Sequence, residues 1–198
     1  INNAGLTCTA NFLEHDLSHW QHIIGVNLMG VVHGCRSFIP HMLTLKEAHI
    51  VNISSLFGLV GVPGQTAYCT SKFAVRGLSE ALWMELTGSP IGLTVVHPGG
   101  VSTQIAKNSH YTNNDLKQHM TRIFEKNLMT PQDAALRIIV GIERNQRSVL
   151  ITREAKIAAL LKRLLPVRAV RMFSEGMLKS FRLRRFESNF LLHTNEAD

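Results

Sequence analysis

Tyr68 and Lys72 are the residues of this sequence whose types and spacing most directly suggest chemistry. They lie four apart in a segment of helical composition, so both side chains share one face of the expected helix. A free tyrosine has a pKa of about 10, too high for a base at neutral pH, and an ammonium group one turn away lowers that pKa. The pair could therefore exchange a proton with a substrate oxygen, although YxxxK spacing alone is a weak signal.

Two further polar residues strengthen this interpretation. Ser55 follows a β-branched run at residues 49–54, and the carboxyl ends of such buried strands are where ligands bind in doubly wound sheets. Its hydroxyl could hydrogen-bond a substrate oxygen beside the phenol. Asn27 lies within an apolar helix, where a carboxamide is costly unless it is paired. Each residue alone is more often a satisfied polar group of the core, but the four together favour a catalytic set.

The elements that must position these residues alternate along the chain. Residues 1–2 resemble the end of a strand, a Gly/Pro-rich loop covers residues 58–64, and residues 102–129 are polar and irregular. Short buried strands that alternate with helices predict an α/β fold, with a parallel sheet and helices on both faces. The expected strands are 49–54, 91–97 and 148–152, and the expected helices are 17–44, 66–86 and 131–145, the last opened by a capping box at 130–133.

Composition limits the classes of function. The chain has 198 residues, of which 45% are hydrophobic and 18% charged, as is ordinary for one globular domain. The formal net charge of +7 arises from residues 162–185, so it describes a tail and not a basic domain. Without aromatic stacking platforms or zinc-finger spacing, we expect no nucleic-acid partner.

Cysteine and histidine usage indicates an ordinary reducing environment. Cys8, Cys35 and Cys69 form no CxxC pair, which predicts free thiols in a cytoplasmic protein. His15, His19 and His22 fall at i, i+4 and i+7, but no acid or cysteine completes a set, so we expect a solvated helix face and no metal site. Polar residues interrupt every long uncharged run, so we expect no membrane-spanning segment.

Residues 153–198 read as a basic amphipathic extension of the domain at 1–152. Three roles remain open for it: contact with an anionic membrane surface through residues 153–190, a lid over the active site, or a contact with a second subunit. One apolar stripe comprises Ile157, Leu160, Leu161, Leu164 and Leu165, and a second comprises Val167, Val170, Phe173, Met177 and Phe181.

The motifs as a set resemble the short-chain dehydrogenase/reductase family from residue 1 to about 152. They are Asn2-Asn3-Ala4-Gly5, Asn27 in VNLMG, Ser55 in VNISS, Tyr68 and Lys72 in YCTSK, and Pro98, Gly99 and Thr103 in PGGVST. The resemblance implies a Rossmann-type doubly wound parallel sheet. It also implies hydride transfer between NAD or NADP and an alcohol or carbonyl substrate.

The resemblance assigns roles residue by residue. It makes Tyr68 the acid/base, with Lys72 lowering the pKa of Tyr68 and holding the nicotinamide ribose. Ser55 would polarise the substrate oxygen, and Asn27 would anchor a water that links Lys72 to solvent. The remaining cofactor contacts would come from Asn3, Ala4 and Gly5 on the adenosine side, and from Pro98, Gly99, Val101 and Thr103 around the carboxamide.

One departure from the family is large. The first strands and the glycine-rich turn that seats the pyrophosphate are absent from the sequence, so we expect an N-terminally truncated fragment of a longer enzyme. The absence also leaves a second interpretation open, a non-catalytic module that keeps the fold for assembly or membrane docking. Because the residue that reads the ribose 2′-position follows a missing strand, NAD and NADP are not distinguished.

Two expectations concern partners. Apolar residues within 105–129 suggest a lipophilic alcohol or ketone as the small-molecule substrate. The resemblance implies a homodimer or homotetramer joined through a four-helix interface. The apolar residues expected there are Val31, Val32, Phe38, Ile39, Phe73, Val75, Leu78, Leu82 and Trp83.

Overall fold

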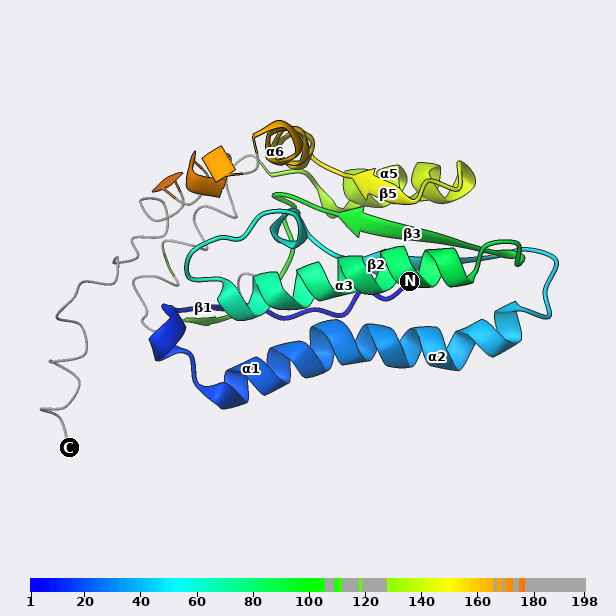
Figure 1. Ribbon diagram of the computed structural model, residues 1–198, viewed down its shortest axis with the longest axis horizontal. Coiled ribbons are helices and arrows are strands. Elements are labelled where there is room, and N and C mark those ends of the chain that lie inside the picture. The colour runs from blue at the N-terminus through cyan, green and yellow to red at the C-terminus, as the bar shows by residue number, and fades with distance from the viewer. Residues whose placement is uncertain are drawn as a thin grey trace, which may run out of the picture.

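A parallel sheet forms the centre of the molecule in the computed structural model. Its strands are β2 (Ala48–Ile53), β3 (Ile91–His97) and β5 (Ser148–Leu150), hydrogen-bonded in the order β2-β3-β5 (Figure 1). The structure describes residues 1–105, 109–111, 118, 128–165, 167–168, 170–172 and 175–176. The predicted α/β class and the three predicted strands are confirmed.

The chain's first residues extend this sheet beyond β2. Asn2 pairs in parallel with Asn52, because the Asn2 N–H donates to the Val51 carbonyl at 2.8 Å and the Ile53 N–H donates to the Asn2 carbonyl at 3.1 Å. The residues that follow Asn2 therefore leave the sheet at the same edge as the residues that follow β2 and β3.

Helices begin where side chains can cap them. Asp16, Thr130 and Thr152 each accept a hydrogen bond from the first turn of the helix that follows, which satisfies an otherwise unpaired backbone N–H. The helices are α1 (Leu17–Ile24), α2 (Gly30–Met42), α3 (Thr66–Glu85), α5 (Pro131–Glu143) and α6 (Arg153–Leu164), with short 3₁₀ turns η1 (Phe12–Glu14) and η3 (Leu56–Gly58).

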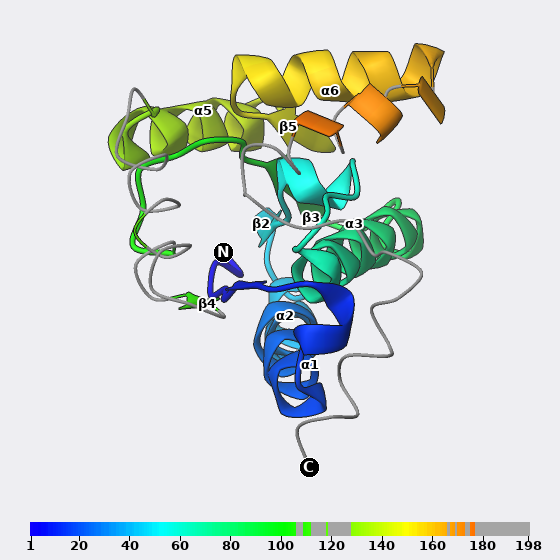
Figure 2. The same cartoon turned by 90° about the vertical axis from the view of Figure 1, so that its left-hand side faces the viewer.

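The sheet separates two hydrophobic layers, because successive strand residues point to opposite faces. On one face α2 and α3 pack over β2 and β3 through Val31, Cys35, Ile50, Val75 and Leu93. On the other face α5 covers Val51, Val96, Val149 and Ile151. Figure 2 shows α5 on the opposite side of the strands from α3. This arrangement is the doubly wound one expected from the sequence.

Two local features differ from the sequence-based expectation. The helix expected over 17–44 contains a π-helical turn, η2 (Gly25–Met29), between α1 and α2. In addition, β1 (Cys8–Thr9) pairs in parallel with β4 (His110–Tyr111), within a stretch expected to be irregular. Strands of two residues are too short to show a hydrophobic period, so no sequence pattern indicates them.

The histidine expectation is partly wrong. His22 is exposed and His19 half-buried, but His15 is buried beside the Trp20 ring, with ring centroids 6.2 Å apart. His15 precedes α1 because Asp16 caps that helix, so it lies outside the helical face assumed from its spacing. Cys8, Cys35 and Cys69 are free, as expected, and all three are buried.

Most residues of the expected subunit interface are half-buried in this chain, and several of them pack against its core. Val31 and Val75 are buried, and Ile39, Leu78, Leu82 and Trp83 pack against the same cluster. Only Phe38 of the expected interface residues is strongly exposed, at 62%. Length and hydropathy would also allow the helical run Leu17–Met42 to cross a membrane, but a core helix meets the same criterion and this run packs on the sheet.

Candidate functional site

Lys72 is buried at the centre of the candidate site. Its Nζ donates a hydrogen bond to the Ile53 carbonyl at the end of β2, at 2.8 Å, and lies 5.8 Å from the centre of the Tyr68 ring. Burial lowers the pKa of Lys72 to about 8, because the charged form loses solvation. The predicted pairing of Tyr68 and Lys72 on one face of α3 is therefore present.

Ser55 and Tyr68 face each other across the turn that follows β2. Ser55 caps η3, since its Oγ accepts from the Phe57 N–H at 3.1 Å. Burial raises the pKa of Tyr68 to about 12, and the neighbouring Ser55 hydroxyl opposes this shift. At neutral pH the phenol is therefore a proton donor.

This pKa differs in direction from the sequence-based expectation. The expected effect of Lys72 was to lower the pKa of Tyr68, but burial of the phenol outweighs the other contributions. The Lys72 ammonium is itself partly desolvated and donates to the Ile53 carbonyl. Burial thus shifts both pKa values toward the neutral forms, while Lys72, with a pKa of about 8, still carries its proton at neutral pH.

The approach of η3 to α3 depends on a glycine. A Cβ at Gly58 would lie 2.7 Å from the Lys72 carbonyl oxygen and 2.3 Å from the Ser54 Oγ, so no larger residue fits without movement. The Ser54 hydroxyl donates to the same Lys72 carbonyl at 2.8 Å. The turn that starts at Ser55 is thereby held against the helix that carries Tyr68 and Lys72.

Asn27 is fully buried inside the π-helical turn. Its Oδ1 accepts from the Leu6 N–H at 2.7 Å, and its Nδ2 donates to the Leu6 carbonyl and the Ser71 Oγ, both at 2.9 Å. The Ser71 hydroxyl in turn donates to the Tyr68 carbonyl at 2.7 Å. Asn27 therefore joins the segment after Gly5 to the part of α3 that carries Tyr68 and Lys72.

The residues expected to hold the cofactor gather at the carboxyl ends of neighbouring parallel segments. Asn3 and Ala4 are exposed after the Asn2 bridge, and Thr103 is exposed beyond β3. Pro98 accepts from the Leu56 N–H at 2.7 Å, and half-buried Gly99 follows it. Buried Val101 bridges to Met129. Such an edge is where nucleotides bind in doubly wound sheets.

Gly5 provides a test of whether these residues fit a nicotinamide nucleotide. A Cβ built at Gly5 would lie 3.4 Å from the Lys72 Nζ and 3.6 Å from the Asn27 Oδ1. A larger residue here would fill the space beside the ammonium group that is expected to bind the ribose. The small residue, the buried ammonium and the exposed hydroxyl of Thr103 together fit the nicotinamide half of the cofactor.

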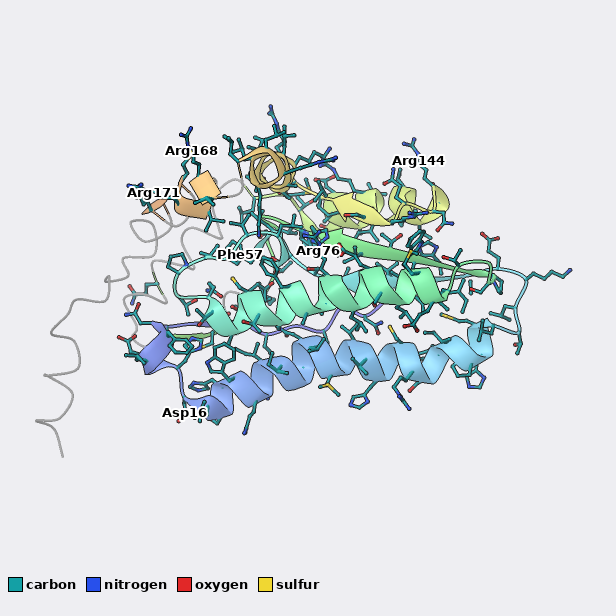
Figure 3. The ribbon with its side chains drawn as sticks, in the orientation of Figure 1. Asp16, Phe57, Arg76, Arg144, Arg168 and Arg171 are labelled. Carbon is teal, nitrogen blue, oxygen red and sulfur yellow. The ribbon has the colours of Figure 1, made fainter. Side chains whose placement is uncertain are left out.

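Sequence reasoning missed two residues that contact the Ser55 turn. His97 is 1% exposed, and its Nδ1 lies 3.1 Å from the Ser55 carbonyl. Phe57 packs edge-on against the Tyr68 ring, with centroids 6.2 Å apart; Figure 3 labels it above the start of α3. The position of His97 directly before Pro98-Gly99 was a usable signal, whereas nothing in the sequence marked Phe57.

The tail helix α6 contacts the same turn. Ala158 packs with Leu59 and Val60 just after η3, and the Lys162 Nζ donates to the Leu59 carbonyl. The stripe predicted for this helix points the other way, with Ile157 55%, Leu160 57% and Leu164 65% exposed. Of the second predicted stripe, Val167 and Val170 are exposed, while Phe173, Met177 and Phe181 lie outside the described residues.

Comparison with protein families agrees with the geometry. The model of the short chain dehydrogenase family matches residues 1–114. A protein named oxidoreductase SadH, from Mycobacterium tuberculosis, is 39% identical over 184 residues, covering 91% of this chain and 67% of that protein. A 3-alpha-(or 20-beta)-hydroxysteroid dehydrogenase from Mycobacterium bovis is 40% identical over 103 residues, covering 52% of this chain and 40% of that protein.

Solved structures show the same architecture. A short chain dehydrogenase/reductase from Burkholderia phymatum in complex with NAD superposes with a TM-score of 0.76 at 29% identity, covering 84% of this chain and 66% of that one. The chain thus spans about two thirds of the length of SadH and of this structure. The family match over residues 1–114, with the Ser55, Tyr68 and Lys72 geometry, shows that the chain belongs to the short-chain dehydrogenase family of NAD(P)-dependent oxidoreductases.

Proposed function

We propose that the protein catalyses hydride transfer between NAD or NADP and an alcohol or carbonyl substrate, with Tyr68 as the acid/base. The observation that carries this proposal is the meeting of three groups at one place, the Ser55 hydroxyl, the Tyr68 phenol and the Lys72 ammonium, whose Nζ lies 5.8 Å from the centre of the phenol ring. A bound nicotinamide supplies or accepts the hydride. The protein's part is to hold the substrate oxygen and to move its proton.

Each of the four site residues has a distinct part in this scheme. In carbonyl reduction the Tyr68 hydroxyl donates its proton to the substrate oxygen, while the Ser55 hydroxyl orients that oxygen. Lys72 stabilises the resulting phenolate and holds the ribose, because its ammonium lies beside the small residue Gly5. Asn27 anchors a water from which the proton returns through Lys72.

The cofactor-binding set is proposed on its placement at one edge of the sheet. Asn3 and Ala4 serve the adenosine side, Gly5, which the family resemblance also put there, lies beside Lys72 at the nicotinamide ribose, and Pro98, Gly99, Val101 and Thr103 serve the carboxamide. Support comes from the parallel pairing of Asn2 with Asn52, which brings the first group to the carboxyl end of β2. The relatives named above are oxidoreductases or dehydrogenases, so no observation favours the alternative of a non-catalytic module.

A lipophilic alcohol or ketone is the substrate class we propose. The Phe57 ring, which packs edge-on against Tyr68, places an apolar surface beside the phenol. One relative is named a hydroxysteroid dehydrogenase, and another, from Thermotoga maritima, a 3-oxoacyl-[acyl-carrier-protein] reductase. Most of the apolar set within 105–129 lies outside the described residues.

The experiment that tests the function compares Tyr68→Phe with Thr70→Ala, an exposed control on the same helix. Oxidation and reduction are followed by nicotinamide absorbance with NAD and NADP, using cyclohexanol, 2-octanone and androsterone as probes. Tyr68→Phe should lower kcat by about 10²–10⁴-fold, because the proton transfer is lost. The binding of NADH or NADPH, measured by fluorescence, should stay within twofold. An unchanged kcat in Tyr68→Phe would overturn the assignment.

We propose that the protein is cytoplasmic, and two further proposals concern its surroundings. We propose a homodimer or homotetramer, supported by the exposed apolar residues Leu136, Ile139 and Val140, which share one face of α5, and by Phe38 on α2. We also propose peripheral contact between residues 153–190 and an anionic membrane. The outward stripe of Ile157, Leu160 and Leu164 supports it, with exposed basic residues beside it at Lys156 and Arg163.

A further inference from the structure

The inner face of α6 is built to approach the active-site turn closely. Ala155 and Ala158 are fully buried, and Ala158 packs with Leu59 and Val60. Alanine side chains let the helix backbone lie near the chain segment that it covers. Lys162, one turn further along, points from this same inner face. The tail helix is therefore packed onto the catalytic body through one face and exposed on the other.

Lys162 contacts both segments that carry the catalytic residues. Its Nζ donates to the carbonyl of Leu59, which follows η3, and lies 4.6 Å from the centre of the Phe73 ring on α3. Phe73 is the neighbour of Lys72 in the sequence. Burial, and the positive charge of Arg76, lower the pKa of Lys162. One side chain thus bridges the turn after Ser55 and the helix of Tyr68 and Lys72.

The turn held by Lys162 is the one that sets the position of Ser55. The Gly58 N–H donates to the Ser55 carbonyl at 2.9 Å, and the Leu59 N–H donates to the Leu56 carbonyl at 2.9 Å. Leu59 is thus hydrogen-bonded to Leu56, and its neighbour Gly58 to Ser55, so a shift of Leu59 disturbs the turn that holds Ser55 beside the phenol. Displacements of about 1 Å in a catalytic group can cost about 10²-fold in rate.

We propose that Lys162 is a positioning residue for the reaction, which ties the Ser55 turn to α3. The effect of Lys162 on the reaction rate rests on the proposed function, whereas its contact with Leu59 and Phe73 does not. It assigns α6 to the catalytic body, and it makes the ammonium of Lys162 the group that keeps the Ser55 hydroxyl in register with the Tyr68 phenol.

The test compares Lys162→Met with Lys162→Arg and with Arg163→Met in the complete protein. Methionine keeps the length and apolar packing but removes the donor, and arginine keeps a donor. Arg163 is the adjacent, exposed cation, so Arg163→Met is the matched control for the lost charge. Hydrogen exchange of the peptide covering residues 56–60 reports on the turn, and steady-state kinetics with the probes above reports on catalysis.

We expect Lys162→Met to speed exchange of residues 56–60 by at least about tenfold and to lower kcat by about 10–100-fold. KM and the dissociation constant of NADH or NADPH should stay within about threefold. In Lys162→Arg, both the exchange rate of residues 56–60 and kcat should be close to those of the unaltered protein. Unchanged exchange in Lys162→Met overturns the contact. Faster exchange with unchanged kcat overturns the positioning role. An equal loss of kcat in Arg163→Met also overturns it. A wild-type protein without turnover refutes the proposed function, while the exchange result still decides the contact.

Discussion

Burial disfavours the charged form of each of the two central side chains, although Lys72 remains an ammonium at neutral pH. It raises the pKa of Tyr68 to about 12 and lowers the pKa of Lys72 to about 8, because each charged form loses solvation. The neutral Tyr68 phenol, beside the Lys72 ammonium with its lowered pKa, is well suited to donate its proton to the substrate oxygen in carbonyl reduction. Alcohol oxidation needs the phenolate, so we expect it to increase with pH while reduction decreases.

Lys72→Met tests this arrangement at the residue scale. Loss of the cation should move the pH at which oxidation begins to a higher value, because the phenolate loses its stabilising neighbour. The affinity for NADH should also weaken, since Lys72 is proposed to hold the ribose. The pH–rate profile and a fluorescence titration measure the two effects. If both match those of the unaltered protein, Lys72 has no part in the reaction.

His97 makes the folded state sensitive to acid. Burial lowers the pKa of His97 to about 4, whereas an unfolded histidine titrates at about 6.5. Between these values the unfolded state binds one proton more at His97 than the folded state does. The contribution of His97 to the free energy of unfolding is therefore full above about pH 6.5 and is lost as the pH falls through about 4. His97→Asn should make the melting temperature depend less on pH between about 4 and 6.5. His33→Asn, at an exposed position on α2, should leave this pH dependence unchanged.

At the element scale, the π-helical turn at Gly25–Met29 is the feature most closely linked to the site. π-Helical turns are rare and occur frequently at functional sites. Here Asn27, within the turn, spans from the Leu6 backbone to Ser71. A local change in one helix thus connects the chain after Gly5 with α3.

Asn27→Ala should be strongly destabilising. The substitution leaves the Leu6 N–H and carbonyl without their partner, at about 1–3 kcal/mol for each group that stays buried. Chemical denaturation measures the loss in the free energy of unfolding. Met29→Ala in the same turn is the control, because Met29 is exposed and should lose well under 1 kcal/mol. Similar losses in the two variants would contradict the role given to Asn27.

At the scale of the whole molecule, α6 presents different faces to the protein and to solvent. Lys162 and the buried alanines face inward, whereas the apolar stripe faces outward, and Figure 3 shows Arg168 and Arg171 at the surface of the segment that follows. This separation favours a membrane or subunit contact for the outer face and does not require the helix to detach from the active site.

Vesicle flotation tests the membrane contact. Binding to vesicles with phosphatidylglycerol should be strong at low salt and decline steeply as salt is added, because each nearby cation contributes about 1 kcal/mol that salt screens. Leu160→Asp should abolish binding, and Leu136→Asp on α5 should not. Absence of bound protein at low salt would discard the membrane proposal in favour of a subunit contact.

The proposed assembly is tested by light scattering at micromolar concentration. A dimer or tetramer mass is expected for the unaltered protein. Ile139→Asp should reduce that mass, because a buried carboxylate is costly in an apolar interface. Ile157→Asp, on the outer face of α6, serves as the control if that face contacts a membrane. A monomer mass for the unaltered protein would count against the assembly.

The sequence by itself determined the alternation of strands and helices and the family, and it predicted the four site residues. These features depend on short-range patterns: β-branched runs for β2 and β3, capping residues such as Thr130, and the spacing of Tyr68 and Lys72. Each pattern depends only on residues that are close together in the sequence, so it can be recognised without knowledge of the rest of the chain.

Only the tertiary structure decided which residues act on the site from a distance. The contacts of His97 with Ser55 and of Lys162 with Leu59 join residues 42 and 103 positions apart. The pKa of Tyr68 likewise depends on desolvation of the phenol in the folded chain, and this shift is opposite in direction to the one expected from Lys72 alone. The outward direction of the stripe on α6 was also undetermined, because small buried alanines, and not the leucines, face the core.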